Sequence, residues 1–221
     1  MGKSKRKQLN KKEILDVLEK LQDMYPEAVS ELNYESPFEL LISTILAAQC
    51  TDVRVNQVTE KLYKQYNTPK AMLTLSEEEL GNWIHSCGFY KTKSRNILNT
   101  CRILMEKYGG EVPQTREELV ELPGVGRKTA NVVISNAFGK PAIAVDTHVF
   151  RVSNRIGLAY SENVEDTEQQ LMKNIPKKKW SDAHHWLIYH GRRICKARKP
   201  LCGECPLYEE CLYYNALTEK S

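Results

Sequence analysis

The segment Leu122–Ala130, with the sequence LPGVGRKTA, places a proline, two glycines and a lysine at the start of an apolar helical repeat. Thr115 and Glu118 have the spacing of a capping box, which predicts a short helix that runs to about Leu122. The proline after it ends that helix, and the glycines permit a tight turn whose backbone can approach another molecule. A second helix follows, so the sequence predicts a helix-hairpin-helix unit at about residues 115–137.

This predicted hairpin is a candidate phosphate site. Backbone N–H groups at a helix N-terminus attract an anion, and Arg127 adds a positive charge at the same place. A P-loop needs glycine directly before the lysine, where Arg127 stands, and a dinucleotide fingerprint needs a third glycine where Thr129 stands. Both nucleotide-binding motifs are therefore excluded. On this segment alone, an ordinary helical turn with a solvated lysine remains the alternative.

Lys128 is a candidate nucleophile because of its position. Cations are normally found near helix C-termini, whereas Lys128 lies in the first turn of the second predicted helix. The helix dipole and the adjacent Arg127 both disfavour the charged ammonium, and any partial burial would disfavour it further. A neutral lysine amine can form a Schiff base.

Asp146 is the second candidate for chemistry. Within the segment Ala142–Val149, an apolar extended run ends abruptly at this residue. Aspartate is among the best N-cap residues, so its simplest role is to begin a helix. An ionised carboxylate in that position can also stabilise positive charge developing on a sugar, or accept a proton from a lysine. His148, two residues later, is a candidate for orienting such a site.

Four of the seven cysteines lie close together near the C-terminus with the spacing C-x6-C-x2-C-x5-C. These are Cys195, Cys202, Cys205 and Cys211. No signal peptide or disulfide-rich composition is present, so metal ligation is favoured over disulfides. The spacing alone does not separate iron–sulfur from zinc. The other three, Cys50, Cys87 and Cys101, are expected to be buried in helical packing.

Positive charge is concentrated in two places, although the net charge is only +4. Residues 196–201, preceded by Arg192 and Arg193, would clamp a phosphate if a metal fixed the loop, and a solvated surface loop is the alternative. Residues 1–12 carry six Lys or Arg and no acid. We expect them to form a solvated tail that either adds non-specific attraction for DNA or has no role. No apolar run approaches the roughly 20 residues that span a membrane.

The rest of the sequence reads as successive helices. Ser36 with Glu39 and Ser76 with Glu79 have capping-box spacing, and little of the chain alternates as a strand does. The chain is therefore predicted to be all-α, with enough residues for one large or two modest cores.

Together, LPGVGRKTA, the VDTH that contains Asp146 and the cysteine quartet resemble the endonuclease III family of DNA glycosylases. This family belongs to the helix-hairpin-helix Gly/Pro-Asp superfamily. The resemblance covers nearly the whole chain, including SPFELLISTILAAQCTD at 36–52 and HHWLIYHGRRIC at 184–195. It implies a six-helix barrel at 30–139 that contains the hairpin. It also implies a discontinuous helical domain at 1–29 plus 140–221, with a cluster loop at 195–211 and a DNA groove between the two domains.

The resemblance also assigns roles to individual residues. Lys128 matches the family's nucleophile and Asp146 its essential carboxylate, while the four clustered cysteines match the ligands of a [4Fe–4S] cluster. Gln49 and Phe89 match two positions that insert into the space left by a flipped base, although the family more often has leucine where Phe89 stands. The hairpin residues expected to bind DNA are Pro123, Gly124, Val125, Gly126 and Arg127.

The function implied is that of a bifunctional DNA glycosylase and AP lyase of base excision repair. Such an enzyme removes oxidised pyrimidines through a lysine Schiff base and cuts the strand 3′ to the abasic site by β-elimination. The expected partner is double-stranded DNA that contains damaged bases or abasic sites. A monomeric, cytoplasmic, bacterial-type protein that meets the nucleoid through DNA, with no membrane association, is expected.

Three alternatives remain open from the sequence. The same hairpin and cluster would also suit a non-catalytic DNA-damage sensor, which would bind DNA without forming a Schiff base. If the quartet held zinc, the helices would suit a DNA-binding regulator. Within the superfamily, the adenine-specific branch is the nearest competitor, but its members generally lack the lysine found here at position 128. That branch also carries an added C-terminal domain, whereas this chain ends ten residues after Cys211.

Overall fold

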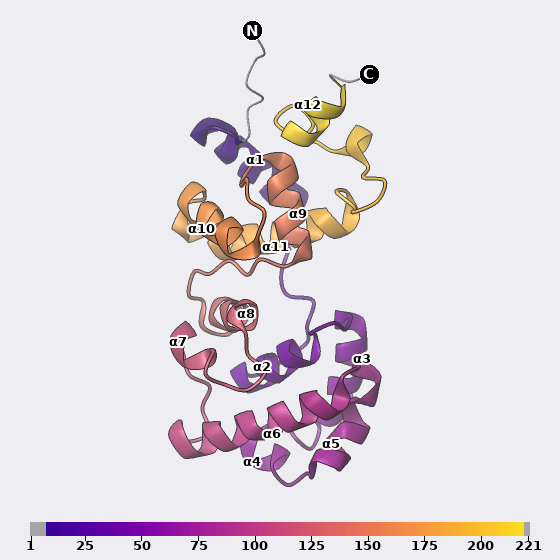
Figure 1. Cartoon of the computed structure of the whole chain (residues 1–221), viewed down its shortest axis with the longest axis vertical. Helices are drawn as coiled ribbons and strands as arrows, with labels where there is room; N and C mark the ends of the chain where they lie inside the picture. Colours follow the sequence, from indigo (N-terminus) through magenta and orange to yellow (C-terminus); the bar gives the residue numbers. More distant parts are fainter. Residues whose placement is uncertain (1–7, 219–221) are drawn as a thin grey trace. The chain divides into compact units, whose positions relative to one another are not determined.

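A computed structural model describes residues 8–218 of the chain (Figure 1). The chain forms two compact units, one made of Met1–Val29 with Pro141–Ser221 and the other of Ser30–Lys140. All regular structure in the described residues is helical, which confirms the all-α prediction. None of the helices described between residues 8 and 218 is long and apolar enough to cross a membrane.

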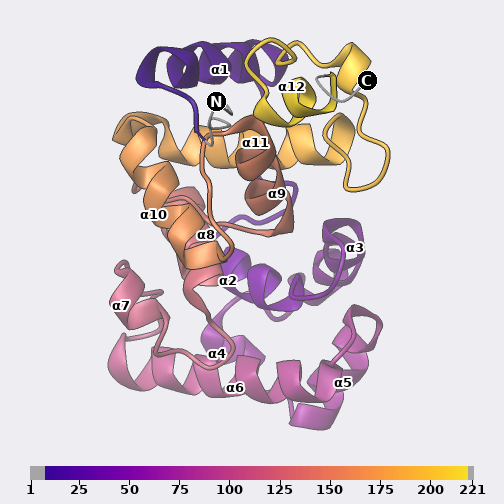
Figure 2. The ribbon, with the colours of Figure 1, turned by 45° about the horizontal axis from the view of Figure 1, so that its top comes forward.

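The discontinuous unit is built from both ends of the chain (Figure 2). Its helices are α1 (Lys11–Met24), α9 (Thr147–Ile156), α10 (Val164–Asn174), η2 (Lys177–Lys179), α11 (Trp180–Arg193), η3 (Cys202–Glu204) and α12 (Leu212–Thr218). The predicted basic tail lies mostly in residues 1–7, outside the described residues. Lys11 and Lys12 were predicted to belong to that tail, but they form the first turn of α1. The reason is that Asn10 and Glu13 make a complete capping box just before them.

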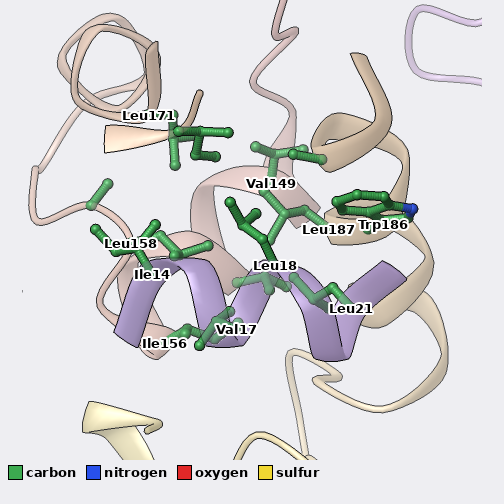
Figure 3. Close-up of a cluster of buried hydrophobic side chains, with 14 of the residues drawn as sticks. Ile14, Val17, Leu18, Leu21, Val149, Ile156, Leu158, Leu171, Trp186 and Leu187 are labelled. Atoms are coloured by element: carbon green, nitrogen blue, oxygen red, sulfur yellow. The ribbon is translucent and has the colours of Figure 1, made fainter. Parts of the chain in front are cut away.

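The core of this unit shows why the two ends of the chain fold together. On α1, Ile14, Val17, Leu18 and Leu21 recur at helical spacing and are all buried. Figure 3 shows Leu18 and Leu21 near Val149 of α9 and Trp186 and Leu187 of α11, whereas Ile14 and Val17 lie near Leu158 and Ile156. Helix α1 thus supplies an apolar stripe that the C-terminal helices cover.

The continuous unit is centred on α2. Its helices are α2 (Pro37–Leu46), α3 (Asp52–Leu62), α4 (Pro69–Met72), α5 (Glu77–Ile84), η1 (His85–Cys87), α6 (Tyr90–Lys107), α7 (Arg116–Leu119) and α8 (Arg127–Phe138). Every residue of α2 from Phe38 to Leu46 is buried. This helix packs against α3, α6 and α8, so it carries the core on all its faces.

The predicted helix starts are confirmed, with one difference in how they are capped. Ser76 and Glu79 form a complete capping box, whereas Ser36 accepts the N–H of Glu39 without the reciprocal bond. The Glu39 carboxylate instead accepts the N–H of Glu35, 2.6 Å away. Thr115 caps α7 as predicted, but α7 ends at Leu119 and continues to Leu122 only as turns.

Candidate active site and cluster loop

The hairpin between α7 and α8 is a tight turn over Leu122–Val125. The Val125 N–H donates to the Leu122 carbonyl over 3.0 Å, and Gly124 has φ +80°. A proline followed by a residue with positive φ is the pattern of a type II turn. A Cβ on Gly124 would lie 3.2 Å from the Cβ of Asn96, so the turn needs glycine both for its backbone angle and for its packing.

The turn is fixed from behind by buried groups. Leu122 and Val125 are both buried, and the Thr100 hydroxyl of α6 donates to the Pro123 carbonyl over 3.0 Å. The hairpin is therefore held on a packed helix, which keeps its outward backbone in one position.

Helix α8 begins without a side-chain cap. Gly126 is its N-cap residue, with φ −89° and ψ 175°, and apart from its chain neighbours no atom of residues 8–218 lies within 4 Å of the place where a Cβ would be. We predicted that Gly126 forms part of the tight turn. Its φ of −89° is one that any residue adopts, so the backbone does not require glycine at this position. Among residues 8–218, the backbone N–H groups of Lys128 and Thr129 have no acceptor. These N–H groups can bind an anion such as a phosphate.

Lys128 lies in the first turn of α8 and is exposed. Its ammonium has no hydrogen-bond or ion-pair partner in the described part of the chain, and no acidic residue lies in that first turn. The partial burial that we considered for this lysine is therefore absent. The amine is accessible to an external substrate beside the open backbone N–H groups.

Asp146 is the N-cap of α9, as predicted. Its Oδ1 accepts the N–H groups of His148 and Val149, each over 2.8 Å. Its Oδ2 has no hydrogen-bond partner among residues 8–218, and the residue is only half-buried. One oxygen thus fixes the carboxylate, and the other is available to a substrate.

His148 packs where α9 meets α11. A Cβ on Gly191 would lie 3.0 Å from both the Cβ and the Nδ1 of His148, so only glycine allows this approach. Burial lowers the pKa of His148, and the Asp146 carboxylate partly opposes that shift. The predicted orienting role therefore has a geometric basis: His148 is held against α11 while its backbone fixes Asp146.

Arg151 links the start of α9 to the first residue of the cysteine quartet. Its guanidinium donates to the carbonyl of Gly191 over 2.9 Å and to that of Cys195 over 3.0 and 3.1 Å. It also reaches the Thr147 carbonyl and His148 Nδ1. Arg151 was not among the predicted site residues. Its acceptors Gly191 and Cys195 lie about 40 residues farther along the chain, so its neighbours in the sequence do not indicate this contact.

All four cysteines of the quartet line one pocket, together with apolar and aromatic side chains that include Ile156, Tyr208 and Tyr213. The Arg155 guanidinium lies 3.6 Å from the Cys195 sulfur, and His190 Nε2 lies 3.5 Å from the Cys205 sulfur. A cation and a ring nitrogen are therefore close to two of the sulfurs, as is common around metal-bound thiolates.

The chemistry of the pocket fits an iron–sulfur cluster. Burial raises the pKa of the Cys205 thiol to about 11, so a thiolate there needs a bound cation. A [4Fe–4S] cluster is held in proteins by four cysteine thiolates, and four cysteines line this pocket.

The two residues predicted to insert into DNA share an unusual backbone. Gln49, between α2 and α3, has φ +56°, and Phe89, which precedes α6, has φ +48°. Both are exposed, Phe89 by 66%. Only one other non-glycine residue among residues 8–218, Lys199, has positive φ. Such strain is typical of functional loops and leaves no trace in the sequence.

The remaining cysteines differ in part from the prediction. Cys87 and Cys101 are buried as expected. Cys50 is only half-buried and lies in the loop after α2, because the helix ends at Leu46 and the chain turns through Gln49.

Known protein families and relatives match the chain over most of its length. Residues 42–177 match the family model of the HhH-GPD superfamily base excision DNA repair proteins, and residues 195–211 match the iron–sulfur binding domain of endonuclease III. The chain is 53% identical to endonuclease III of Escherichia coli over 93% of its own length and 97% of the relative's. It is 52% identical to endonuclease III of Bacillus subtilis, over 92% and 93%.

The fold also matches that of a solved structure. The protein superposes with a TM-score of 0.90 on endonuclease III in a trapped covalent intermediate with DNA, and the two chains are 50% identical. The match covers 95% of this chain and 99% of that one. The chain belongs to the endonuclease III family, within the HhH-GPD superfamily of base excision DNA repair proteins, and carries that family's [4Fe–4S] cluster.

Proposed function

We propose that this protein is a DNA glycosylase and AP lyase that removes oxidised pyrimidines from double-stranded DNA. The observation that carries the proposal is Lys128: an accessible amine in the first turn of α8, directly after an anion-binding hairpin. The covalent DNA intermediate trapped for the related endonuclease III supports a mechanism that passes through a bond between protein and DNA.

Lys128 supplies the nucleophile. Its nitrogen bonds to the sugar C1′ as the bond between C1′ and the base breaks, and the departing base takes the electron pair and a proton. The sugar ring then opens to give a Schiff base at C1′. The imine acidifies the 2′-hydrogen, and its loss breaks the C3′–O bond, which cuts the strand on the 3′ side.

Asp146 stabilises the positive charge that the sugar develops as the base leaves. Its Oδ1 is already used by two backbone N–H groups, so Oδ2 faces this task with a fixed orientation. The cap therefore contributes twice, since it starts α9 and holds the carboxylate in place.

The hairpin and the two loops bind and distort the DNA. The open N–H groups of Lys128 and Thr129, the turn residues Pro123 to Gly126 and the charge of Arg127 hold a phosphate near the lesion. Gln49 and Phe89 fill the space left by the extruded nucleotide. An exposed phenylalanine can stack between bases, so it replaces the leucine more usual at that position.

The cluster would be held by Cys195, Cys202, Cys205 and Cys211. When bound, it supplies four iron–thiolate bonds that cross-link the basic loop, which has few apolar residues of its own. Through Arg151, this loop also supports the start of α9, where Asp146 lies.

The proposal is tested with Lys128→Gln on duplexes that contain one abasic site or one thymine glycol. We expect base release and strand cleavage to fall at least about 10⁴-fold because the nucleophile is lost, while DNA binding stays within about threefold. Lys107→Gln, an exposed lysine at the end of α6, is the matched control and should behave as wild type. Strand cleavage retained by Lys128→Gln would refute the proposal.

The substrate class is tested with defined lesions. Thymine glycol should be excised, and adenine opposite 8-oxoguanine should not. The reverse preference would assign the chain to the adenine-specific branch.

The metal is tested by colour. Purified protein should be brown, absorb in the visible blue and contain about four irons per chain. A colourless protein with stoichiometric zinc would contradict the cluster assignment.

A further inference from the structure

Lys93 of α6 is a buried cation that the proposed chemistry does not use. Its side chain is buried, with 5% of the residue exposed, and no carboxylate lies within ion-pair distance in the described part of the chain. Its ammonium donates to three backbone carbonyls, those of Leu46, Ala48 and Cys87, each over 2.8 Å. An ammonium has three N–H donors, so every one of them is used.

These carbonyls belong to the two loops that present Gln49 and Phe89. Leu46 ends α2 and Ala48 directly precedes Gln49. Cys87 ends η1, two residues before Phe89. One side chain therefore joins two chain segments that are about 40 residues apart in sequence.

Further contacts tighten the same junction. The backbone N–H of Lys93 donates to the Phe89 carbonyl over 2.9 Å, so the residue holds that loop through both its backbone and its side chain. The thiols of Cys50 and Cys87, which flank the two inserting residues, lie close enough to interact electrostatically.

The backbone of the two loops needs such support. Gln49 and Phe89 both adopt left-handed φ angles, which are unfavourable for residues other than glycine. Strained residues keep such angles only when neighbouring contacts hold them. Burying a charge without a counter-ion is also costly, and carbonyls at the end of a helix such as α2 offset that cost.

We propose that Lys93 is a positioning residue for DNA distortion, whose ammonium holds the Gln49 and Phe89 loops in one arrangement so that both side chains enter the DNA stack together. This inference rests on the proposed function, because it concerns how the lesion is exposed to Lys128. It assigns Lys93 no contact with DNA and no part in bond breaking.

The test measures unstacking apart from chemistry. In a Lys128→Gln background, 2-aminopurine placed opposite a tetrahydrofuran abasic analogue becomes fluorescent when the enzyme unstacks it. We expect Lys93→Met to keep DNA binding within about threefold but to lose more than half of the fluorescence rise, because the loops no longer insert together. Lys107→Met, on the same helix but exposed, is the control and should keep the full rise.

Activity with Lys128 restored gives the second readout. Lys93→Met should lower kcat/KM on a thymine glycol duplex about 10- to 100-fold, as small misplacements of a substrate do. Lys93→Arg keeps the charge but cannot direct three donors from one nitrogen, so it should show the same loss in milder form. If Lys93→Met does not fold, Lys93→Arg carries the test.

The outcomes separate this inference from the proposed function. A full fluorescence rise in both folded Lys93 variants overturns the positioning role. So does a loss of DNA binding that parallels the loss of the rise, since that result indicates a merely structural residue. If the Lys128→Gln parent itself shows no rise and no preference for the abasic duplex, the proposed function fails instead.

Discussion

Two helix starts in this protein carry its candidate chemistry, and they are built in opposite ways. Helix α8 begins at Gly126, which offers no side chain to its backbone N–H groups, and it has a cation, Lys128, in its first turn. Helix α9 begins at Asp146, whose Oδ1 accepts two N–H groups. The first start is open and the second is closed by its own carboxylate.

The difference shows how one structural element provides two kinds of site. An open helix start can bind an external anion beside an amine in its first turn. A closed start satisfies its own donors and fixes a negative charge. A reaction in which an amine attacks a sugar while a carboxylate stabilises positive charge requires both.

The largest expected effect is on base release when Asp146, the cap of α9, loses only its charge. Asp146→Asn keeps a side-chain oxygen that caps as well as aspartate does, so the free energy of unfolding should change by less than about 0.5 kcal/mol. Base release should nevertheless fall about 10²- to 10⁴-fold, because the carboxylate no longer stabilises the cation. Thermal melts and single-turnover excision assays measure the two quantities. Excision within threefold of wild type would show that Asp146 is only a cap.

The next largest effect concerns the contacts that connect α9 to the cluster loop. Arg151→Met removes the guanidinium bonds to the Gly191 and Cys195 carbonyls and should lower the free energy of unfolding by about 2 kcal/mol. Urea unfolding followed by circular dichroism measures this loss. Arg102→Met on exposed α6 surface is the control, with less than about 0.5 kcal/mol expected. Equal losses in both variants would remove Arg151 as the link between α9 and the cluster loop.

A third variant converts the open start into a closed one. Gly126→Asp fits the space and backbone at that position, and it should cap α8 and stabilise it by a few tenths of a kcal/mol. The new carboxylate competes with phosphate, so affinity for an abasic duplex should fall about tenfold. Gly126→Ser caps without charge and should lose less. Fluorescence anisotropy compares them, and unchanged affinity for Gly126→Asp would mean that the open start does not bind phosphate.

The smallest expected effect concerns the backing of the hairpin. Thr100→Val keeps the shape of the side chain and removes its bond to the Pro123 carbonyl, so unfolding should become easier by about 1 kcal/mol. Differential scanning calorimetry on this variant and on the exposed Thr92→Val should separate the specific loss from a general one. No difference between the two would show that α6 does not hold the turn through this bond.

Local patterns in the sequence predicted what depends on neighbouring residues. The caps at Ser76, Thr115 and Asp146 and the turn at Gly124 each follow from a few adjacent residues, and each is confirmed. The family resemblance then predicted the two-domain organisation, which local patterns do not contain. It also made specific the roles of Lys128 and the cysteines, which position and spacing had indicated only as a candidate nucleophile and candidate metal ligands.

What the sequence did not reveal depends on contacts between distant segments. Lys93 looks like any polar residue of an amphipathic helix, and its burial follows only from three carbonyls on other segments. The left-handed angles of Gln49 and Phe89 are set by the same packing. The acceptors of Arg151 likewise lie about 40 residues farther along the chain.

The role of Lys128 is tested by locating the covalent bond between protein and DNA. The wild-type protein is incubated with an abasic duplex and sodium borohydride, digested, and examined by tandem mass spectrometry. We predict a single reduced adduct on Lys128, because it is the amine placed at the open start of α8. If the adduct lies on another lysine or on the N-terminal amine, Lys128 is not the nucleophile. The same conclusion follows if no adduct forms while strand cleavage proceeds.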